Sequence, residues 1–241
     1  MVIPTVDTEL KLLAAAKSDF LESGIHVIVS SEAFIKTCGN KRETIAFFNS
    51  RGIDTPPIID PDSPKFPFFV RPISGSNSKN VFKVNDASQV SPQFDDTSRF
   101  LLQEYVGGEG VNEYSLDLYY DRNSVLKCIV PRRRVAIRGG EMSKGKACKN
   151  QLIPFVREKL DTIPGAVGCL TLQVFLNSNT NQIFGIEINP RFGGGFPLSY
   201  FAGAQYPQWL LSEYLLNQKI EYFDQWKEDT VLLRYDNEMI I

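Results

Sequence analysis

Two short segments in the second half of the chain constrain its fold more than any other feature. Residues 168–176 (GCLTLQVFL) and 182–189 (QIFGIEIN) are rich in β-branched and aromatic side chains, which favour strands. Residues 177–181 (NSNTN), which lie between them, have the composition of a turn. The pattern therefore predicts a β-hairpin.

The polar residues of this hairpin are expected to share a face. Side chains alternate along a strand, so Glu187 and Asn189 should point to the same side, with Gln173 within reach on the neighbouring strand. A carboxylate beside amides offers the oxygen ligands that a hard cation such as Mg²⁺ prefers. The alternative is the plain outer face of an amphipathic hairpin. The opposite face is expected to carry Phe184, Ile186 and Ile188.

The composition agrees with a cytoplasmic enzyme but does not identify one. With 241 residues and 43% hydrophobic residues, the chain can bury one substantial core or two modest ones. Its net charge of −2 gives no overall attraction to nucleic acid or to an anionic membrane. No apolar run reaches the ~18 residues that a membrane span needs, so we expect no membrane partner.

The cysteines and the single histidine argue against several kinds of site. The four cysteines form no CxxC pair, and we expect reduced thiols in the cytoplasm. The only histidine, His26, lies in the apolar run 25–29 and is expected to pack within a strand. Catalysis by histidine and a zinc site with histidine ligands are therefore not expected.

The N-terminal part is typical of strand and helix in alternation. We expect a buried strand to end near Val2, an Ala- and Leu-rich helix to reach about Phe20, and residues 25–29 to form a short strand. Asp7 and Glu9 follow the first strand, where loops often carry ligands, with a turn or capping role as the alternative.

The order Gln173, Glu187, Asn189, Pro190 and Arg191 resembles the metal-binding end of the ATP-grasp superfamily, in particular its carbamoyl-phosphate-synthase-like branch. Other segments typical of that superfamily follow in the expected order across nearly the whole chain. The resemblance implies an α/β fold with α+β lobes, in which two lobes clasp ATP. It also implies ATP and Mg²⁺ (or Mn²⁺) as cofactors, with Gln173, Glu187 and Asn189 as the metal ligands.

The resemblance predicts three parts. Residues 1–38 correspond to a remnant of a Rossmann-like domain that precedes the ATP-grasp fold, 39–102 to the small lobe and 103–241 to the large lobe. The earlier strands of the preceding domain are expected to be missing, which would leave a sheet edge exposed. We therefore expect a homodimer or another partner to cover that edge.

Two cations and a small-residue loop are expected to hold the phosphates. Lys41 follows Asn40 at a helix start, and Arg71 precedes Pro72 at the end of a strand, as in the superfamily. A solvated lysine in the first helical turn is the alternative for Lys41. The resemblance implies that backbone N–H groups of the next loop contact the phosphates, around Gly75, Ser76 and Ser78.

That loop departs from the superfamily pattern, because Asn77 and Asn80 stand where glycines are common. Asparagine tolerates left-handed backbone conformations better than most residues.

The resemblance places the nucleoside at the hinge between the lobes. The backbone of Glu104, Tyr105 and Val106 would contact adenine, and a later glutamate would bind the ribose hydroxyls. Glu113 matches that glutamate best. Because the spacing is two residues longer than in carbamoyl phosphate synthase, Glu109 remains the alternative.

The segment 131–149 is basic, with seven Lys or Arg residues against one acidic residue. It resembles the part of the superfamily that lines the cleft beside the triphosphate and acceptor, and Arg134, Arg138 and Lys144 are the residues we expect there. For Arg132 and Arg133 an outward orientation is the alternative. A solvated loop and a nucleic-acid site remain alternatives, although the segment lacks aromatic residues for base stacking.

After Arg191 the sequence is rich in glycine (193–195), which permits a close turn beside the metal strand. In the superfamily this region contributes to the acceptor site. A helix is expected from about Gln205 to Asn217. Its expected apolar stripe is Trp209, Leu210, Tyr214 and Leu216.

The implied reaction joins small molecules. ATP phosphorylates a carboxylate, and an amine or, less often, a thiol attacks the acyl phosphate. Lys41 and Arg71 would neutralise the triphosphate and Arg191 the acyl phosphate, beside about two Mg²⁺ ions. The alternatives are a catalytically weak ATP-binding module or degenerate paralogue, and a nucleic-acid-binding protein that uses residues 131–149.

Overall fold

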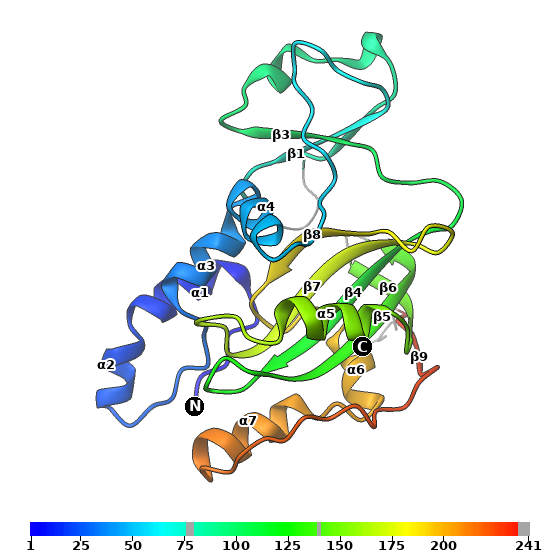
Figure 1. The fold of residues 1–241 in the computed structure, drawn as a ribbon. Coiled ribbons are helices and arrows are strands. Elements are labelled where there is room, and N and C mark those ends of the chain that lie inside the picture. Colours follow the sequence, from blue (N-terminus) through cyan, green and yellow to red (C-terminus); the bar gives the residue numbers. More distant parts are fainter. Residues whose placement is uncertain (76–79, 139–140, 236–241) are drawn as a thin grey trace, which may run out of the picture.

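The strands form two antiparallel sheets, one above the other in Figure 1. The computed structural model describes residues 1–75, 80–138 and 141–235, and the sheets are those of these ranges. The smaller sheet has the order β2-β1-β3, with β1 (Phe68–Pro72), β2 (Phe82–Val84) and β3 (Phe100–Glu104). A mixed α/β fold of this kind is what the resemblance implied.

The larger sheet has the order β8-β7-β4-β5-β6-β9. Its predicted hairpin is confirmed as β7 and β8, and Asn181 in the connecting turn has a φ of 60°, which asparagine tolerates. The strands of this sheet are β4 (Val111–Tyr120), β5 (Leu126–Arg138), β6 (Glu141–Ala147), β7 (Gly168–Asn177), β8 (Ile183–Asn189) and β9 (Val231–Leu233).

The two faces of the large sheet have different neighbours. On one face Leu116 of β4 and Leu172 of β7 belong to a core with α3 (Glu32–Gly39), α4 (Lys41–Ser50) and α5 (Leu152–Leu160). On the other face Tyr119 and Cys169 pack with α6 (Phe196–Phe201) and α7 (Tyr206–Leu215). Further along the same strands this second face becomes polar, and there it borders a cavity.

Helix α4 joins the two sheets. It begins as predicted, with the Asn40 side chain accepting hydrogen bonds from the N–H groups of Arg42 and Glu43. Ile45 packs with Ile73 and Leu101 beside the small sheet, whereas Phe48 belongs to the core under the large sheet. Its two apolar side chains therefore fix the small sheet above the polar face of the large one (Figure 1). Two 3₁₀ turns, Ala87–Gln89 and Pro92–Asp95, precede β3.

The prediction of two N-terminal strands is wrong. Val2 and Val27 form one isolated parallel bridge, and the N–H of Val29 donates to the carbonyl of Val27, which ends the extended run at once. The predicted helix is two short ones, α1 (Asp7–Ala15) and α2 (Lys17–Glu22). Leu10 and Ile35 pack with this bridge in a small separate core.

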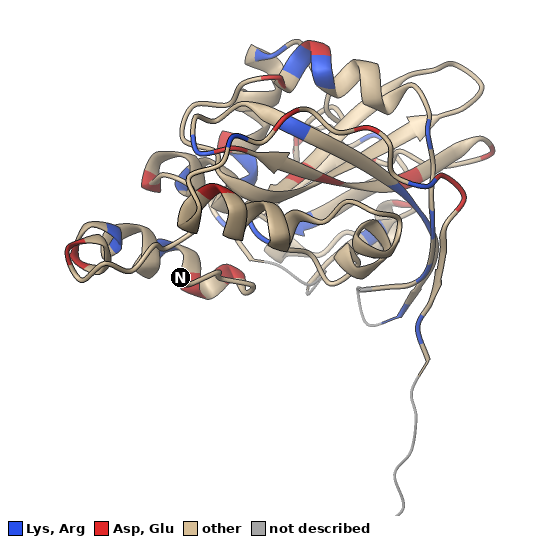
Figure 2. Cartoon of the chain, turned by 90° about the horizontal axis from the view of Figure 1, so that it is seen from below, with Lys and Arg blue, Asp and Glu red and all other residues tan. Residues whose placement is uncertain are grey.

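The basic segment is a β-hairpin and not the solvated loop that was one of the alternatives. Strand β5 continues to Arg138 and pairs with β6. Bulges on either side of Ala136 interrupt the pairing, which explains why the segment shows no clean alternation. Figure 2 shows Lys and Arg recurring along this hairpin.

The helices after the glycine-rich turn differ in part from the prediction. Helix α6 was not expected, and α7 ends at Leu215 rather than near Asn217. Leu210 is buried as predicted, but Leu216 is 65% exposed, because it follows the last turn of the helix. Among the helices in the described ranges, none is long and apolar enough to cross a membrane.

Candidate active site

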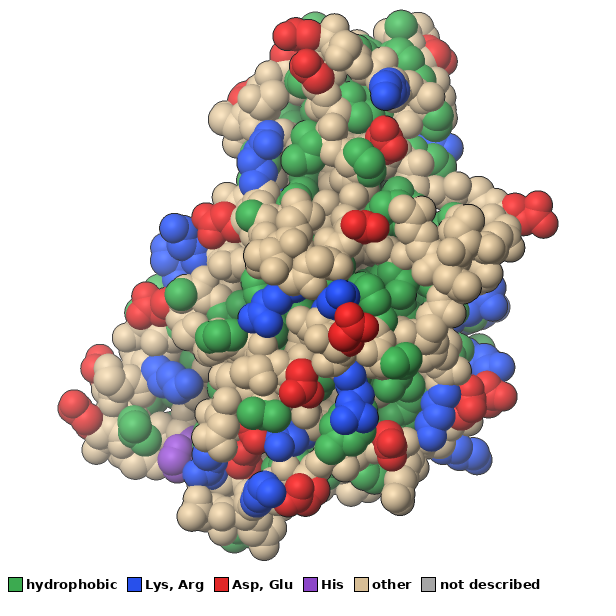
Figure 3. Space-filling model, in the orientation of Figure 1, with side chains coloured by type: hydrophobic (Ala, Val, Ile, Leu, Met, Phe, Trp, Pro, Cys, Tyr) green, Lys and Arg blue, Asp and Glu red, His purple; other side chains and the backbone are tan. Residues whose placement is uncertain are grey.

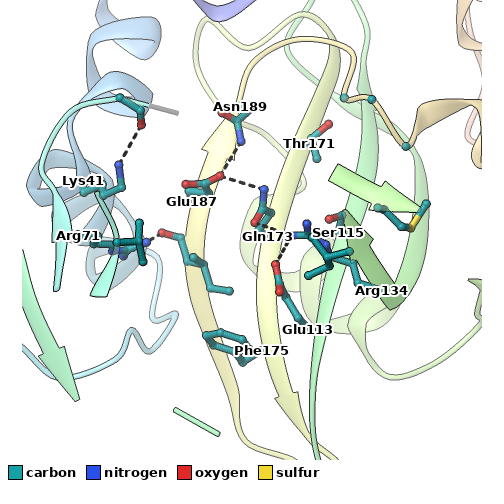
Figure 4. Close-up of a pocket in the computed structure, with 18 of the residues that line it drawn as sticks. Lys41, Arg71, Glu113, Ser115, Arg134, Thr171, Gln173, Phe175, Glu187 and Asn189 are labelled. Carbon is teal, nitrogen blue, oxygen red and sulfur yellow. Dashed lines mark hydrogen bonds and ion pairs between the residues drawn. The ribbon is translucent and has the colours of Figure 1, made fainter. Parts of the chain in front are cut away.

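A cavity of about 590 Å³ lies between the small sheet and the polar face of the large sheet. The start of α4 and strand β1 form one wall, and β4, β5, β7 and β8 form the other (Figure 4). On the face shown in Figure 3, basic and acidic side chains lie next to one another below the small sheet. The predicted residues that border the cavity are Lys41, Arg71, Gly75, Glu113, Arg134, Gln173, Glu187, Asn189 and Arg191.

Cross-strand pairing arranges the polar side chains of the large sheet in rows. Residues that pair across neighbouring strands point to the same face, so each row contains one residue from each strand. The middle row is Glu187, Gln173, Ser115 and Arg132; the rows beside it are Asn189, Thr171 and Asp117, and Phe184, Phe175 and Glu113.

The three predicted metal ligands are in contact. Nε2 of Gln173 and Nδ2 of Asn189 donate to Oε1 of Glu187, at 2.9 and 3.1 Å. Rotating either amide would present its oxygen instead of its nitrogen, so the cluster offers one carboxylate and two amide oxygens. This donor set fits Mg²⁺, provided that a bound ligand supplies further oxygens and negative charge. In the described part of the chain no group of three or more His, Cys, Asp or Glu residues gathers at a metal-binding distance.

The expected alternation along β8 is wrong for one half of the strand. Gln173 pairs with Glu187 but Val174 pairs with Gly185, so Ile186 is the extra residue of a β-bulge. Because of this shift Phe184 pairs with Phe175 and lies on the cavity face of the sheet, not opposite Glu187. The sequence alone does not reveal the bulge.

The two cations of the opposite wall are held by polar contacts. Arg71 is buried; its Nε donates to Oε1 of Gln103 at 2.9 Å, and its Nη2 donates to the carbonyl of Ile186 at 3.4 Å. Nζ of Lys41 donates to the carbonyl of Gly75 at 3.1 Å. Burial lowers the pKa of Lys41 and of Arg71, and the negative charge of Glu187 acts against this in both.

Glu113 and Arg134 form an ion pair on the floor of the cavity, with Arg134 also 3.5 Å from Oε1 of Gln173. Burial raises the pKa of Glu113, and the nearby Arg134 opposes that shift. Glu109, the alternative ribose ligand, is exposed and does not border the cavity. The geometry therefore favours Glu113 for any role within the cavity.

Arg191 is held by the N-terminal segment. Its Nη2 lies 2.7 Å from Oδ2 of Asp7, and its Nη1 donates to the carbonyl of Phe192 at 3.2 Å. Asp7, which the sequence left between a ligand and a capping role, thus orients a cation of the cavity. The two residues are far apart in the sequence, so no local pattern indicates this contact.

Several predicted site residues do not border the cavity. Glu104 and Tyr105 are exposed and Val106 is partly buried at the end of β3. Arg138 and Lys144 are exposed on the β5–β6 hairpin, and Lys144 pairs with Ala136 next to a bulge. Ser76 and Ser78 lie outside the described residues.

The sequence missed a buried ion pair next to the cavity. An outward orientation was the alternative for Arg132, but its side chain is 2% exposed and contacts Asp117, which is fully buried. Arg133 is exposed and donates to Oδ1 of Asn112 at 2.7 Å. Asp117 follows Glu113 and Ser115 at every second position of β4, so alternation along the strand could have placed all three on one face. The partner of Asp117 could not be predicted in this way, because it depends on the pairing of β4 with β5. Phe69 and Phe175, which form apolar parts of the cavity wall, were also missed.

Comparison with known families finds one match. Residues 96–236 match the family described as "ATP-grasp in the biosynthetic pathway with Ter operon". The match includes β3, all strands of the large sheet and the glycine-rich turn. A search of curated proteins finds no significant match.

Solved structures share the fold at low sequence identity. One is the Campylobacter jejuni biotin carboxylase with a β,γ-ATP ligand, with a TM-score of 0.73 and 9% identity; the match covers 95% of this chain and 57% of that chain. Another is the biotin carboxylase domain of the Hydrogenobacter thermophilus 2-oxoglutarate carboxylase with Mg-ADP, ADP and bicarbonate. Its TM-score is 0.71 at 12% identity, and the match covers 92% of this chain and 55% of that chain. The third is an L-amino acid ligase from Bacillus licheniformis, with a TM-score of 0.67 and 16% identity; the match covers 87% of this chain and 54% of that chain. This chain therefore spans little more than half the length of each.

Proposed function

This chain belongs to the ATP-grasp family, and we propose that it is a Mg-ATP-dependent ligase that joins a carboxylate to an amine or thiol. The γ-phosphoryl group of ATP passes to a carboxylate oxygen and leaves ADP. The amine nitrogen then attacks the acyl carbon, phosphate leaves, and the nitrogen loses a proton to give an amide. The cluster of Glu187, Gln173 and Asn189 opposite Lys41 and Arg71 is the observation that supports this proposal most strongly.

The walls of the cavity suggest how the nucleotide lies. Phe69 and Phe175 offer apolar surface for the base, and Glu113, which pairs with Phe175 across β4 and β7, is next to it for the ribose hydroxyls. Lys41 and Arg71 face the cluster from the other wall and neutralise the phosphates. Burial has already removed water from Arg71, which strengthens its interaction with an anion.

Glu187, Gln173 and Asn189 would hold Mg²⁺, which when bound supplies positive charge to the transferring phosphoryl group. The chain's own contribution is to position and neutralise. Arg191, oriented by Asp7, is placed to stabilise charge that develops on the acyl phosphate. None of these residues needs to act as a covalent nucleophile.

Binding of Mg-ATP tests the nucleotide site. Because a ligand that binds only the folded state stabilises it, millimolar Mg-ATP should raise the Tm. ATP with EDTA should raise the Tm far less. Mg²⁺ without ATP should also raise the Tm far less, because the cluster contains a single carboxylate. An unchanged Tm with Mg-ATP would contradict the proposal.

Substitutions at the cluster test the metal assignment. Glu187→Gln removes its only carboxylate and should weaken Mg-ATP binding by about tenfold or more, measured by calorimetry. Binding of ATP in EDTA should be equal or tighter, because a negative charge near the phosphates is gone. The matched variant Gln173→Glu adds a carboxylate and should lower the Mg²⁺ concentration that half-saturates binding at fixed ATP. Superimposable Mg²⁺ titrations for all three proteins would rule out a metal role.

Turnover separates a ligase from a module that only binds ATP. ADP release should rise when a carboxylate and an amine are supplied together, and should stay low with either alone. Mg-ATP binding without ADP release across a broad panel would favour the catalytically weak module.

A further inference from the structure

The ion pair of Arg132 and Asp117 forms a fixed cationic group at one end of the cavity. Nη2 of Arg132 donates to Oδ1 of Asp117 at 2.8 Å, and Nε lies 2.7 Å from Oδ2 without a well-aligned hydrogen bond. Asp117 also accepts from the hydroxyl groups of Ser199 at 2.6 Å and Thr171 at 3.3 Å. The carboxylate is thus fully used, and the guanidinium is locked in one orientation.

The third nitrogen of Arg132 lacks an oxygen partner. In the described part of the chain, the hydrogen-bond partner of Nη1 is the thioether sulfur of Met142 at 3.8 Å, a weak acceptor. Arg132 is 2% exposed and borders the cavity, so this N–H group is shielded from bulk water. A buried cationic donor without a good acceptor is costly, and an oxygen of a ligand in the cavity would satisfy it.

Gly195 holds this nitrogen in place. A Cβ atom at Gly195 would lie 1.9 Å from Nη1 of Arg132 and 3.0 Å from Cε of Met142. The glycine-rich turn therefore packs directly on the guanidinium edge, and only a residue without a side chain fits there. The close approach gives Gly195 a role beyond the close turn that the sequence led us to expect.

Arg132 and the metal cluster lie on different strands of the same cavity wall. Arg132 lies in the row of Glu187, Gln173 and Ser115, with three strand spacings between Glu187 and Arg132. At about 4.8 Å per spacing, the two backbone positions are roughly 14 Å apart. The guanidinium of Arg132 turns back toward β4, where it contacts Asp117. Arg132 and Gly195 border the β5 side of the cavity, whereas Lys41 and Arg71 belong to the opposite wall.

We propose that Arg132, held by Asp117 and Gly195, binds a carboxylate of the amine substrate, so that the amine substrate is an α-amino acid. The inference rests on the proposed ligase function. Because Asp117 already balances the charge of Arg132, the position suits a single negative charge and one or two hydrogen bonds, and is poorly suited to a phosphate dianion. The hydroxyl-bearing Ser115, which pairs with Arg132 across the sheet, is the second group on this wall.

The test measures binding of the standard α-amino acids, and of their α-carboxamides, to the protein saturated with Mg-ADP. A thermal-shift screen followed by calorimetry needs no knowledge of the other substrate. At least one amino acid should bind, and its carboxamide should bind at least about tenfold more weakly, since it loses the charge that Arg132 recognises. Binding of no amino acid, or equal binding of an acid and its amide, would overturn the proposal.

Variants assign the effect to Arg132. The double variant Asp117→Asn/Arg132→Gln leaves no unpaired buried charge, and Gly195→Ala displaces the guanidinium without removing it. Both should weaken amino-acid binding by about tenfold or more while the Kd of Mg-ADP stays within about twofold. Gly39→Ala is the matched control, because a Cβ atom there meets nothing within 4 Å. Retained amino-acid binding in both variants would overturn the role of Arg132, whereas absence of Mg-ADP binding in the wild type would overturn the nucleotide site and this proposal together.

Discussion

Three of the arginines that border the cavity lie against carboxylates of the same chain, whereas Arg71 contacts an amide and a backbone carbonyl. Arg134 lies against Glu113, and the pairs of Arg191 with Asp7 and of Arg132 with Asp117 follow the same pattern. Each pair keeps a guanidinium in one orientation before any ligand arrives, which reduces the entropy lost on binding. The pairing also limits the net positive charge of the cavity.

Glu113 gives a pH dependence whose sign follows from its environment. Burial raises the pKa of Glu113 in the folded protein, whereas unfolding restores the ordinary value near 4.5. Between these two pKa values the folded state holds the extra proton, so the contribution of Glu113 to stability falls as the pH rises through that window. The Glu113→Gln variant has no carboxyl group at this position, so its stability lacks this dependence on pH. Urea unfolding from pH 4 to pH 7 should therefore show Glu113→Gln gaining stability relative to the wild type as the pH rises, and a constant difference would contradict the raised pKa.

Among the secondary-structure elements, β8 and α4 depend most closely on each other. A Cβ atom at Gly185 of β8 would lie 2.8 Å from the ring of Phe48, which is fully buried in α4. Gly185→Ala should therefore destabilise the protein by about 1–3 kcal/mol, measured by urea unfolding. Because Gly185 adjoins the bulge before Glu187, the same variant should weaken Mg-ATP binding.

The control for this variant is again Gly39→Ala, which should change stability by no more than about 0.5 kcal/mol. If Gly185→Ala and the wild type had equal free energies of unfolding, the close packing of Gly185 on Phe48 would not contribute to stability.

The sequence predicted those elements whose pattern is local. Residue composition identified β7 and β8, and Asn40 marked the start of α4. It could not predict the bulge at Ile186, because pairing with β7 decides which residue is extra. The same holds for the single bridge at Val2 and for the length of β5, which depend on partners distant in the sequence.

The sequence likewise predicted the local part of the candidate site but not its contacts between distant strands. Glu187, Gln173 and Asn189 lie on one hairpin, so alternation and a short turn were enough to bring them together. Arg132 and Asp117 lie on β5 and β4, and their contact follows from strand register and from the packing of Ser199 on α6. The adjacency of Asp7 and Arg191 requires the whole fold.

For the whole molecule, the cavity lies between the small sheet and the large sheet. Arg71 on β1 reaches the carbonyl of Ile186 on β8, which links the small sheet to the large one. A nucleotide that contacts both walls should hold them together more firmly. Saturating Mg-ATP should then slow amide hydrogen exchange in 68–75 and in 183–189 at once.

Helix α2 (Lys17–Glu22), far from the cavity, serves as the internal reference for that experiment, and ATP in EDTA as its control. Protection confined to one of the two segments would show that the nucleotide binds to a single wall.

The ion pair under the acceptor end of the cavity also sets how new substrate preferences can be obtained in the laboratory. A library that varies Arg132 or Asp117 alone leaves the other charge buried without its partner, and most members should be lost to misfolding before any preference is scored. Productive changes at this position should therefore appear as correlated double substitutions. A selection that randomises both codons together, with Gly195 kept, would reach sequences that stepwise mutagenesis discards.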